Sequence, residues 1–285
     1  MKRILVTLIA LSLLLTTATT HAEAALTEDA AIPMNVEFSA DLDGDGAPET
    51  LLCTLDEADY DTPLTVTVTG GAGTATYATD ILSYASAYLV DLDGDGLTEV
   101  LVTGDEMSDD YCTYCLRWQD GMLYELLFPD ANRSDSNLDC WFRSGYGLIT
   151  AVDGNRLTLT GTQDVLGTWM ASRDVTLAPT GRFEFCDDGV WVRDLGEMNN
   201  DTWEYASLTL TVSLPYVNQY GQTGELAPGD RILIYASDKR EYAWFATPDG
   251  ITGVLAISPD YQRGWGWLIE GLSESECFEY VPYAD

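Results

Sequence analysis

A short acidic turn occurs twice in this chain, each time between runs of apolar residues. Residues 40–52 have the sequence ADLDGDGAPETLL, and residues 90–102 have the sequence VDLDGDGLTEVLV. Each turn places carboxylates at positions 1, 3, 5 and 9 and glycine at position 6. A single turn of this kind is commonly just a solvated Asp-Gly bend, but two copies with the same spacing indicate one structural unit used twice.

Carboxylates at these positions, with a backbone carbonyl at position 7, are how a short loop surrounds a hard cation with oxygen atoms. The first set is Asp41, Asp43, Asp45, Ala47 and Glu49, and the second is Asp91, Asp93, Asp95, Leu97 and Glu99. Without an ion, two carboxylates about 4 Å apart repel by about 4 kcal/mol at an effective dielectric constant near 20. Calcium accepts oxygen ligands in looser geometry than magnesium does, so the sequence predicts two calcium sites.

The flanks of both turns differ from those of an EF-hand. That loop needs a bidentate glutamate at position 12, where this chain has Leu52 and Val102. The segments before and after each turn are β-branched or alternating, as in EVLVTG (99–104), instead of helical. We therefore expect both loops to lie in β-hairpins.

Each acidic turn has the pattern D-x-D-x-D-G-x-x-[DE] between two strand-like segments, and the two copies are about fifty residues apart. This arrangement resembles the FG-GAP/VCBS type of repeat found in integrin-like β-propellers. The resemblance implies a loop between two strands of a blade, with calcium bound there. After Gly104 the acidic loop does not recur, and a propeller has at least about four blades. Degenerate blades that complete a ring and a smaller open β-domain are both compatible with this pattern.

The rest of the chain also has a β texture. Alternating or β-branched runs occupy residues 64–70, 156–162, 207–214 and 231–237, and Asp-Gly pairs that favour hairpin turns separate many such runs. Long amphipathic helical patterns are missing. The sequence therefore predicts an all-β protein, and the FG-GAP/VCBS resemblance implies a β-propeller-like domain, complete, degenerate or partial, at residues 34–198.

The first residues have the pattern of a secretory signal. Lys2 and Arg3 precede the apolar block 4–15, which is too short for a membrane span of about 20 residues, and A-x-A-like cleavage points end at Ala22 and Ala24. We expect a signal peptide at 1–24, a linker at 25–33, and a secreted or envelope location with no membrane span after cleavage. Cleavage would also remove the only histidine, which excludes His-dependent catalytic triads and His-ligated zinc from the mature chain.

Charge and cysteine content narrow the possible partners. The chain has 13 basic and 47 acidic residues, a formal charge of −34, which argues against nucleic acid as a partner. Six cysteines in an exported chain predict disulfides, although 15 pairings are possible. Cys112 and Cys115 form a C-x-x-C that is better interpreted as two structural cysteines on opposite faces of a strand than as a zinc or redox site.

A change of composition at residues 196–202 marks the predicted domain boundary, and residues 203–285 form the second domain. Its segment 225–257 resembles bacterial SH3-like domains, with a Pro-Gly entry turn and an aromatic strand. The resemblance implies a small barrel and an aromatic groove for cell-wall peptides, although Val254 replaces a common aromatic. Two pairs of aromatic residues each share one face of a strand: Tyr242 with Trp244, and Trp265 with Trp267. These four residues either stack on sugars or peptides or fill the core of the small barrel.

Three functions fit these observations. The first is a secreted, non-catalytic calcium-binding module that binds an extracellular protein, a cell-wall peptide or a glycan. The second is a secreted hydrolase of the glycosidase type, which needs two carboxylates and no histidine. The third is a structural spacer in a larger surface assembly. The calcium-binding module is the function that the sequence favours.

Overall fold

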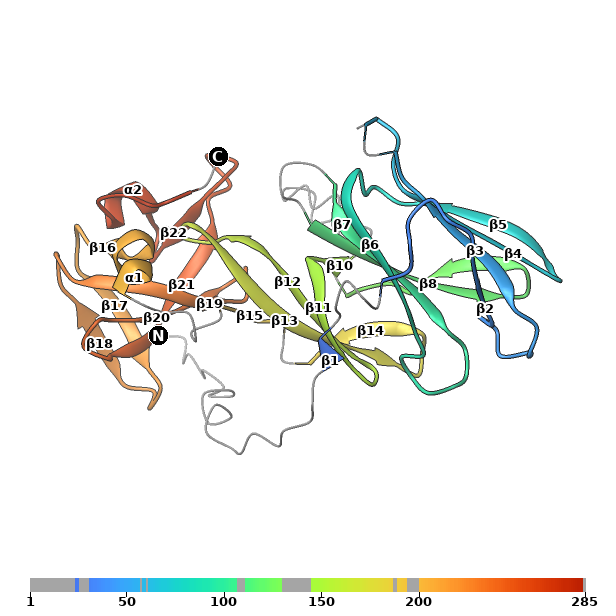
Figure 1. Ribbon diagram of the computed structural model, residues 1–285. Coiled ribbons are helices and arrows are strands. Elements are labelled where there is room, and N and C mark those ends of the chain that lie inside the picture. The colour runs from blue at the N-terminus through green and yellow to red at the C-terminus, as the bar shows by residue number, and fades with distance from the viewer. Residues whose placement is uncertain are drawn as a thin grey trace. The chain divides into compact units, whose positions relative to one another are not determined.

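The computed structural model describes residues 24–25, 31–56, 58–59, 61–106, 111–129, 145–186, 189–193 and 200–283. The fold is all-β, as the sequence predicts, and its strands pair antiparallel (Figure 1). The chain forms two compact units. The N-terminal unit comprises Ala22–Thr162 and Ser172–Gly189, and the C-terminal unit comprises Gln163–Ala171 and Val190–Asp285.

The N-terminal unit contains three sheets, and each includes a meander of four strands that follow one another in sequence. The first sheet consists of β2 (Phe38–Ala40), β3 (Glu49–Thr54), β4 (Thr65–Gly70) and β5 (Gly73–Ala78). The second consists of β6 (Ser83–Val90), β7 (Glu99–Asp105), β8 (Tyr111–Gln119) and β9 (Met122–Glu125), with β10 (Gly145–Tyr146) also on β8. The third contains β11 (Leu148–Asp153), β12 (Arg156–Asp164), β13 (Thr168–Ala178) and β14 (Arg182–Phe185), with β1 (Ala24–Ala25) on β11; the end of β12 and the start of β13 belong to the C-terminal unit.

The second sheet is covered by apolar side chains on both faces. Val100 and Val102 of β7 belong to a core shared with Leu51 and Val66 of the first sheet. Leu101, which points to the opposite face, belongs to another core shared with the third sheet. Every residue of β7 is buried, and because both of its faces are packed, the segment 100–102 is apolar without alternation.

Three of the described cysteines, Cys53, Cys112 and Cys115, occupy these cores. No disulfide joins any two of the five described cysteines, and Cys140 lies outside the described residues. Cys112 lies in the core shared with the first sheet, and Cys115 lies in the core shared with the third sheet. The two cysteines therefore face opposite sides of β8, as predicted. A buried thiol packs as a small apolar side chain, which accounts for these positions without a covalent bond.

The C-terminal unit is built on the meander β19 (Arg231–Ser237), β20 (Tyr242–Ala246) and β21 (Thr252–Pro259). Short strands extend it, and Phe245 and Leu255 are buried in its interior. These strands are β15 (Trp191–Val192), β16 (Leu208–Thr209), β17 (Leu214–Asn218), β18 (Thr223–Leu226), β22 (Trp267–Ile269) and β23 (Leu272–Ser273). The two helices of the described residues, α1 (Asn200–Ala206) and α2 (Glu274–Cys277), are short. Neither has the length and apolar character that crossing a membrane requires.

Most of the predicted strands and turns are confirmed. The run 231–237 is β19, and the turn between β8 and β9 places Asp120 and Gly121 at positive φ, as an Asp-Gly hairpin turn does. The prediction that residues 207–214 form a single strand is wrong. It ends after Thr209 and resumes at Leu214, because Leu210 bridges to Phe278 and the Thr211 N–H donates to the Cys277 carbonyl at 2.8 Å.

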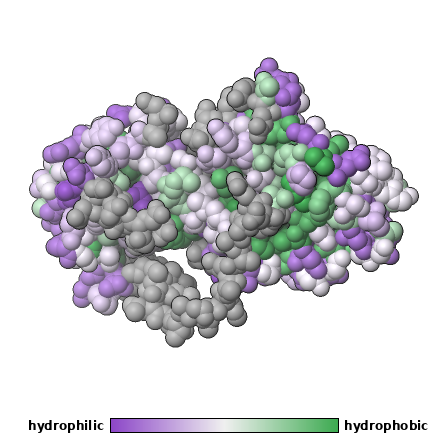
Figure 2. All heavy atoms as spheres, viewed as in Figure 1, coloured by the Kyte–Doolittle hydropathy of each residue, from purple (hydrophilic) through white to green (hydrophobic). Residues whose placement is uncertain are grey.

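Other predictions stay open. None of the sheets closes on itself in the part of the chain that the structure describes, so the propeller and the SH3-like barrel remain predictions. Residues 1–23 of the predicted signal peptide lie outside the described residues. Hydrophilic residues are spread over the visible surface of each unit, and an apolar area lies among them on the N-terminal unit (Figure 2).

Candidate functional site

Both acidic turns lie in β-hairpins, as predicted. Loop 1 (residues 41–49) joins β2 to β3, and loop 2 (residues 91–99) joins β6 to β7. The bends fall on glycines that adopt positive φ, with 71° at both Gly44 and Gly94, 85° at Gly46 and 87° at Gly96. Because only glycine adopts this conformation without strain, the repeated glycines give the two loops the same backbone path.

Four matching hydrogen bonds hold each loop in shape. The Leu42 N–H donates to Glu49 Oε2 at 2.9 Å, and the Leu92 N–H donates to Glu99 Oε2 at 2.9 Å. Both leucines are buried and anchor the start of their loop in a core. The aspartates at positions 1, 3 and 5 accept hydrogen bonds from backbone N–H groups further along their own loop.

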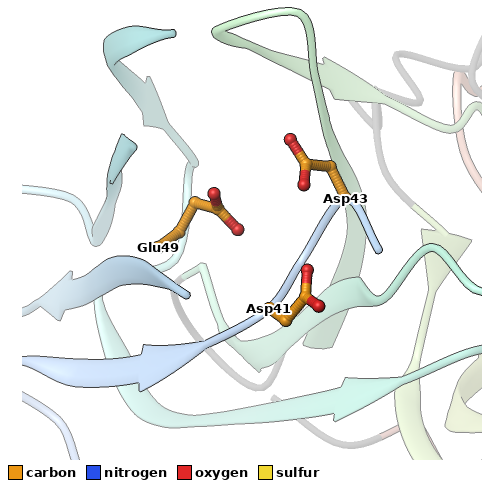
Figure 3. Close-up of side chains that lie close together, drawn as sticks. All are labelled: Asp41, Asp43 and Glu49. Atoms are coloured by element: carbon orange, nitrogen blue, oxygen red, sulfur yellow. The ribbon is translucent and has the colours of Figure 1, made fainter. Parts of the chain in front are cut away.

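In loop 1, the carboxylates of Asp41, Asp43 and Glu49 converge. Each offers an oxygen within 4.8 Å of the others, and Figure 3 shows the three groups turned toward one shared space. Glu49 is only 3% exposed. Its Oε2 is held by the Leu42 N–H, whereas its Oε1 accepts no hydrogen bond from any described residue. The carboxylate of a buried residue therefore lies beside two further carboxylates.

In loop 2, an arginine lies among the carboxylates. Arg117 Nε donates to Glu99 Oε1 at 2.7 Å, and its Nη2 contacts the same oxygen. The guanidinium also reaches Asp93 Oδ2 and Asp95 Oδ2, each at 3.2 Å. The converging trio here is Asp91, Asp93 and Asp95, without the glutamate. The Arg117 side chain is 14% exposed, and that of Glu99 is 0% exposed.

The electrostatics of loop 2 reflect this contact. Burial raises the pKa of Glu99, despite the hydrogen bond from Leu92 and the charge of Arg117. For Asp93, burial would raise the pKa, but the hydrogen bonds and charge of Arg117 outweigh it and the pKa is lowered. The pKa of Arg117 is raised, because its bonds to Glu99 and Asp93 outweigh the effect of burial. The guanidinium thus stays charged beside the carboxylates.

Strand register explains why only loop 2 contains an arginine. Arg117 of β8 pairs directly with Glu99 of β7. In the first sheet, Thr50 pairs with Thr69, which places Gly70 opposite Glu49. A Cβ atom at Gly70 would lie 2.9 Å from Glu49 Cγ and 3.0 Å from its Oε1. The position that holds an arginine beside loop 2 is therefore empty of any side chain beside loop 1.

The two loops also touch each other. The Thr98 N–H donates to the Leu42 carbonyl at 2.9 Å. A Cβ atom on Gly44 would lie 2.8 Å from the Gly96 carbonyl oxygen. Eight carboxylates are thus brought into one region, and Arg117 is the cation that forms ion pairs with them among the described residues. The sequence analysis identified both loops but missed their contact and missed Arg117. Arg117 lies 18 residues after Glu99, whereas Gly70 lies 21 residues after Glu49, so the two positions correspond only through strand register and no signal in the sequence marks them.

The four aromatic candidates are separated by the structure into different environments. Tyr242 and Trp244 are half-buried neighbours on β20, with ring centroids 6.2 Å apart. Trp265 is 65% exposed, and its ring lies edge-on to Tyr283 at 6.3 Å. Trp267 is buried, and its indole N–H donates to the Asp164 carbonyl at 2.8 Å. Trp267 therefore has a structural environment, whereas the other three keep accessible ring surface.

Comparison with family models, with curated proteins and with solved structures finds no match for this chain.

Proposed function

We propose that this chain is a secreted, non-catalytic calcium-binding protein that serves as an extracellular binding or adhesion module of the cell envelope. The observation that carries the proposal is Glu49, a buried residue whose carboxylate converges with those of Asp41 and Asp43 and accepts, among the described residues, only the hydrogen bond from the Leu42 N–H to its Oε2. Leaving such a group without a counter-charge is costly, and a bound cation removes that cost.

The donor set suits calcium. All the side chains offered are carboxylates, with Asp45 and the Ala47 carbonyl as further ligands in loop 1, and hard oxygen donors select calcium or magnesium over zinc or copper. The corresponding ligands in loop 2 are Asp91, Asp93, Asp95, Glu99 and the Leu97 carbonyl. A bound ion would hold the start and the end of a loop together and would offset the repulsion between neighbouring carboxylates.

The partner is proposed to be an extracellular protein, a cell-wall peptide or a glycan. Support comes from the C-terminal unit, where Tyr242, Trp244 and Trp265 retain accessible aromatic surface. Flat rings that remain partly exposed can stack on sugar rings or on apolar side chains. Within this proposal, the calcium loops stiffen the N-terminal unit, and the C-terminal unit makes the contact.

Thermal unfolding with and without calcium tests the calcium-binding part. Sites of extracellular type have dissociation constants of about 0.1–1 mM, so about 10 mM calcium should stabilise the protein by about 1.4–2.7 kcal/mol relative to excess EDTA. Magnesium at the same concentration serves as the control and should give a smaller shift. A melting temperature that is the same in calcium and in EDTA would refute calcium binding.

Glycan and peptidoglycan arrays test the binding part and separate it from the alternatives. Specific retention without change of the ligand supports the binding module. Cleavage of a retained glycan would instead support a carboxylate-dependent hydrolase. Absence of both retention and cleavage would favour a structural spacer. Trp265→Ala, at an exposed position, should weaken retention more than Tyr220→Ala, which removes a comparably exposed ring.

A further inference from the structure

We propose that Arg117 is the built-in cation of loop 2, so that free calcium binds at loop 1 and binds at loop 2 only when this guanidinium is removed. The inference rests on the proposed calcium-binding function and refines it. Although the two loops have the same ligand pattern, loop 1 is assigned as the calcium site and loop 2 as a site filled by arginine. Arg117 thereby acts as the residue that decides how many ions the protein takes up.

Comparison of the loops atom by atom supports this assignment. Loop 2 presents Asp93 Oδ2, Asp95 Oδ2 and Glu99 Oε1 to the guanidinium. The matching atoms of loop 1 are Asp43 Oδ2, Asp45 Oδ2 and Glu49 Oε1, and none of them accepts a hydrogen bond from a described residue. These oxygens thus contact a cationic side chain in loop 2, whereas the matching oxygens of loop 1 contact none among the described residues.

The first aspartate of loop 1 also has fewer hydrogen bonds than the first aspartate of loop 2. Asp91 uses both of its oxygens within its loop, because Gly94 N–H donates to Oδ1 at 2.8 Å and Gly96 N–H donates to Oδ2 at 3.1 Å. Asp41 uses only Oδ2, which accepts from the Gly46 N–H at 2.9 Å. Loop 1 therefore keeps one more carboxylate oxygen available to an incoming ion.

Displacing Arg117 would be unfavourable. An ion entering loop 2 would have to break the contacts of the guanidinium with three carboxylates, and Arg117 would then need a new environment although its side chain is only 14% exposed. A buried charge that loses its partners is strongly disfavoured. At loop 1 no such competitor exists among the described residues, because Gly70 has no side chain.

Calorimetric titration with calcium, at constant ionic strength and after removal of bound ions with a chelator, tests the inference by stoichiometry. The wild-type chain should bind one equivalent of calcium. Arg117→Gln removes the charge while keeping a long side chain, and it should bind two. Arg156→Gln is the matched control, since it removes an arginine that pairs with Asp174 outside the loops, and it should bind one.

A second variant keeps the test decisive if Arg117→Gln does not fold. Asp43→Asn in the otherwise wild-type chain weakens loop 1 alone and should abolish the single binding event. Circular dichroism at each calcium concentration establishes that each variant is folded.

The outcomes separate this inference from the function on which it rests. Two equivalents in the wild-type chain, one equivalent in folded Arg117→Gln, or one equivalent retained in Asp43→Asn would each overturn the role of Arg117 while leaving calcium binding in place. No calcium bound by either the wild-type chain or Arg117→Gln would overturn the proposed function itself.

Discussion

Loop 1 and loop 2 share their acidic positions, their glycines and their hairpin setting, yet their surroundings differ at one strand position. Opposite the last carboxylate of loop 2 is Arg117, and opposite the last carboxylate of loop 1 is Gly70. The comparison teaches that two copies of one acidic motif can share a backbone path and still differ in charge balance, because one residue on the neighbouring strand is an arginine in one sheet and a glycine in the other.

Removing the guanidinium of Arg117 should have the largest effect on the free energy of unfolding. In excess EDTA, Arg117→Gln leaves Glu99 buried without its counter-charge, and such a loss costs about 3–5 kcal/mol. We expect a fall in the free energy of unfolding near the lower end of that range, since Asp93 and Asp95 are partly exposed. Urea denaturation measures it. Arg156→Gln, which breaks a more exposed pair, should cost less than about 1 kcal/mol, and equal losses in the two variants would contradict the account.

Neutralising the buried carboxylate of loop 1 should have the next largest effect. Glu49→Gln should eliminate the calcium-dependent part of stability, about 1.4–2.7 kcal/mol in about 10 mM calcium, because the buried ligand is lost. Thermal melts in calcium and in EDTA measure this difference. Glu37→Gln changes an exposed glutamate before the loop and should retain the full calcium effect. A calcium effect of the same size in Glu49→Gln and Glu37→Gln would exclude Glu49 as a ligand.

Disturbing the contact between the two loops should change the free energy of unfolding by a smaller amount. Gly44→Ala and Gly94→Ala both force alanine into positive φ, which costs about 1–2 kcal/mol. Only Gly44→Ala also places a Cβ atom 2.8 Å from the Gly96 carbonyl oxygen, because nothing lies within 4 Å of a Cβ atom at Gly94. Chemical denaturation should therefore show a greater loss for Gly44→Ala. Identical losses would argue that the loops do not touch in solution.

Substitution of the aspartate at position 5 should give the smallest difference in stability between the two loops. Asp95→Asn in EDTA weakens a partly exposed pair with Arg117 and should cost less than about 1 kcal/mol. Asp45→Asn in EDTA should be neutral or slightly stabilising, since it removes one of several negative charges that form no ion pair with a described residue. Denaturation curves recorded at low ionic strength measure both variants. A larger loss for Asp45→Asn than for Asp95→Asn would reverse the expected order.

The sequence predicted local features well. The doubled acidic turn placed both loops in hairpins, and Asp-Gly pairs marked turns such as that at Asp120 and Gly121, because backbone conformation at glycine is a local property. The i to i+3 spacing of Cys112 and Cys115 was sufficient to place them on opposite faces of β8. The predicted disulfides are not formed among the described cysteines: Cys112 and Cys115 are buried in two different cores, whereas Cys186 is exposed.

Features that depend on contacts distant in sequence were not predicted. Thr98 meets Leu42, and Arg117 meets Glu99, only because of how the sheets and strands pair. The interruption of the strand after Thr209 depends likewise on Cys277 and Phe278, far along the chain. Such contacts leave no periodic pattern in a single sequence, so the difference between the two loops became visible only in three dimensions.

A crystal structure determined from crystals grown in millimolar calcium tests the central comparison most directly. The account predicts an ion in loop 1, bound by Asp41, Asp43 and Glu49, and the Arg117 guanidinium in place among the carboxylates of loop 2. An ion in loop 2 with Arg117 turned away, or only water beside Glu49, would contradict it.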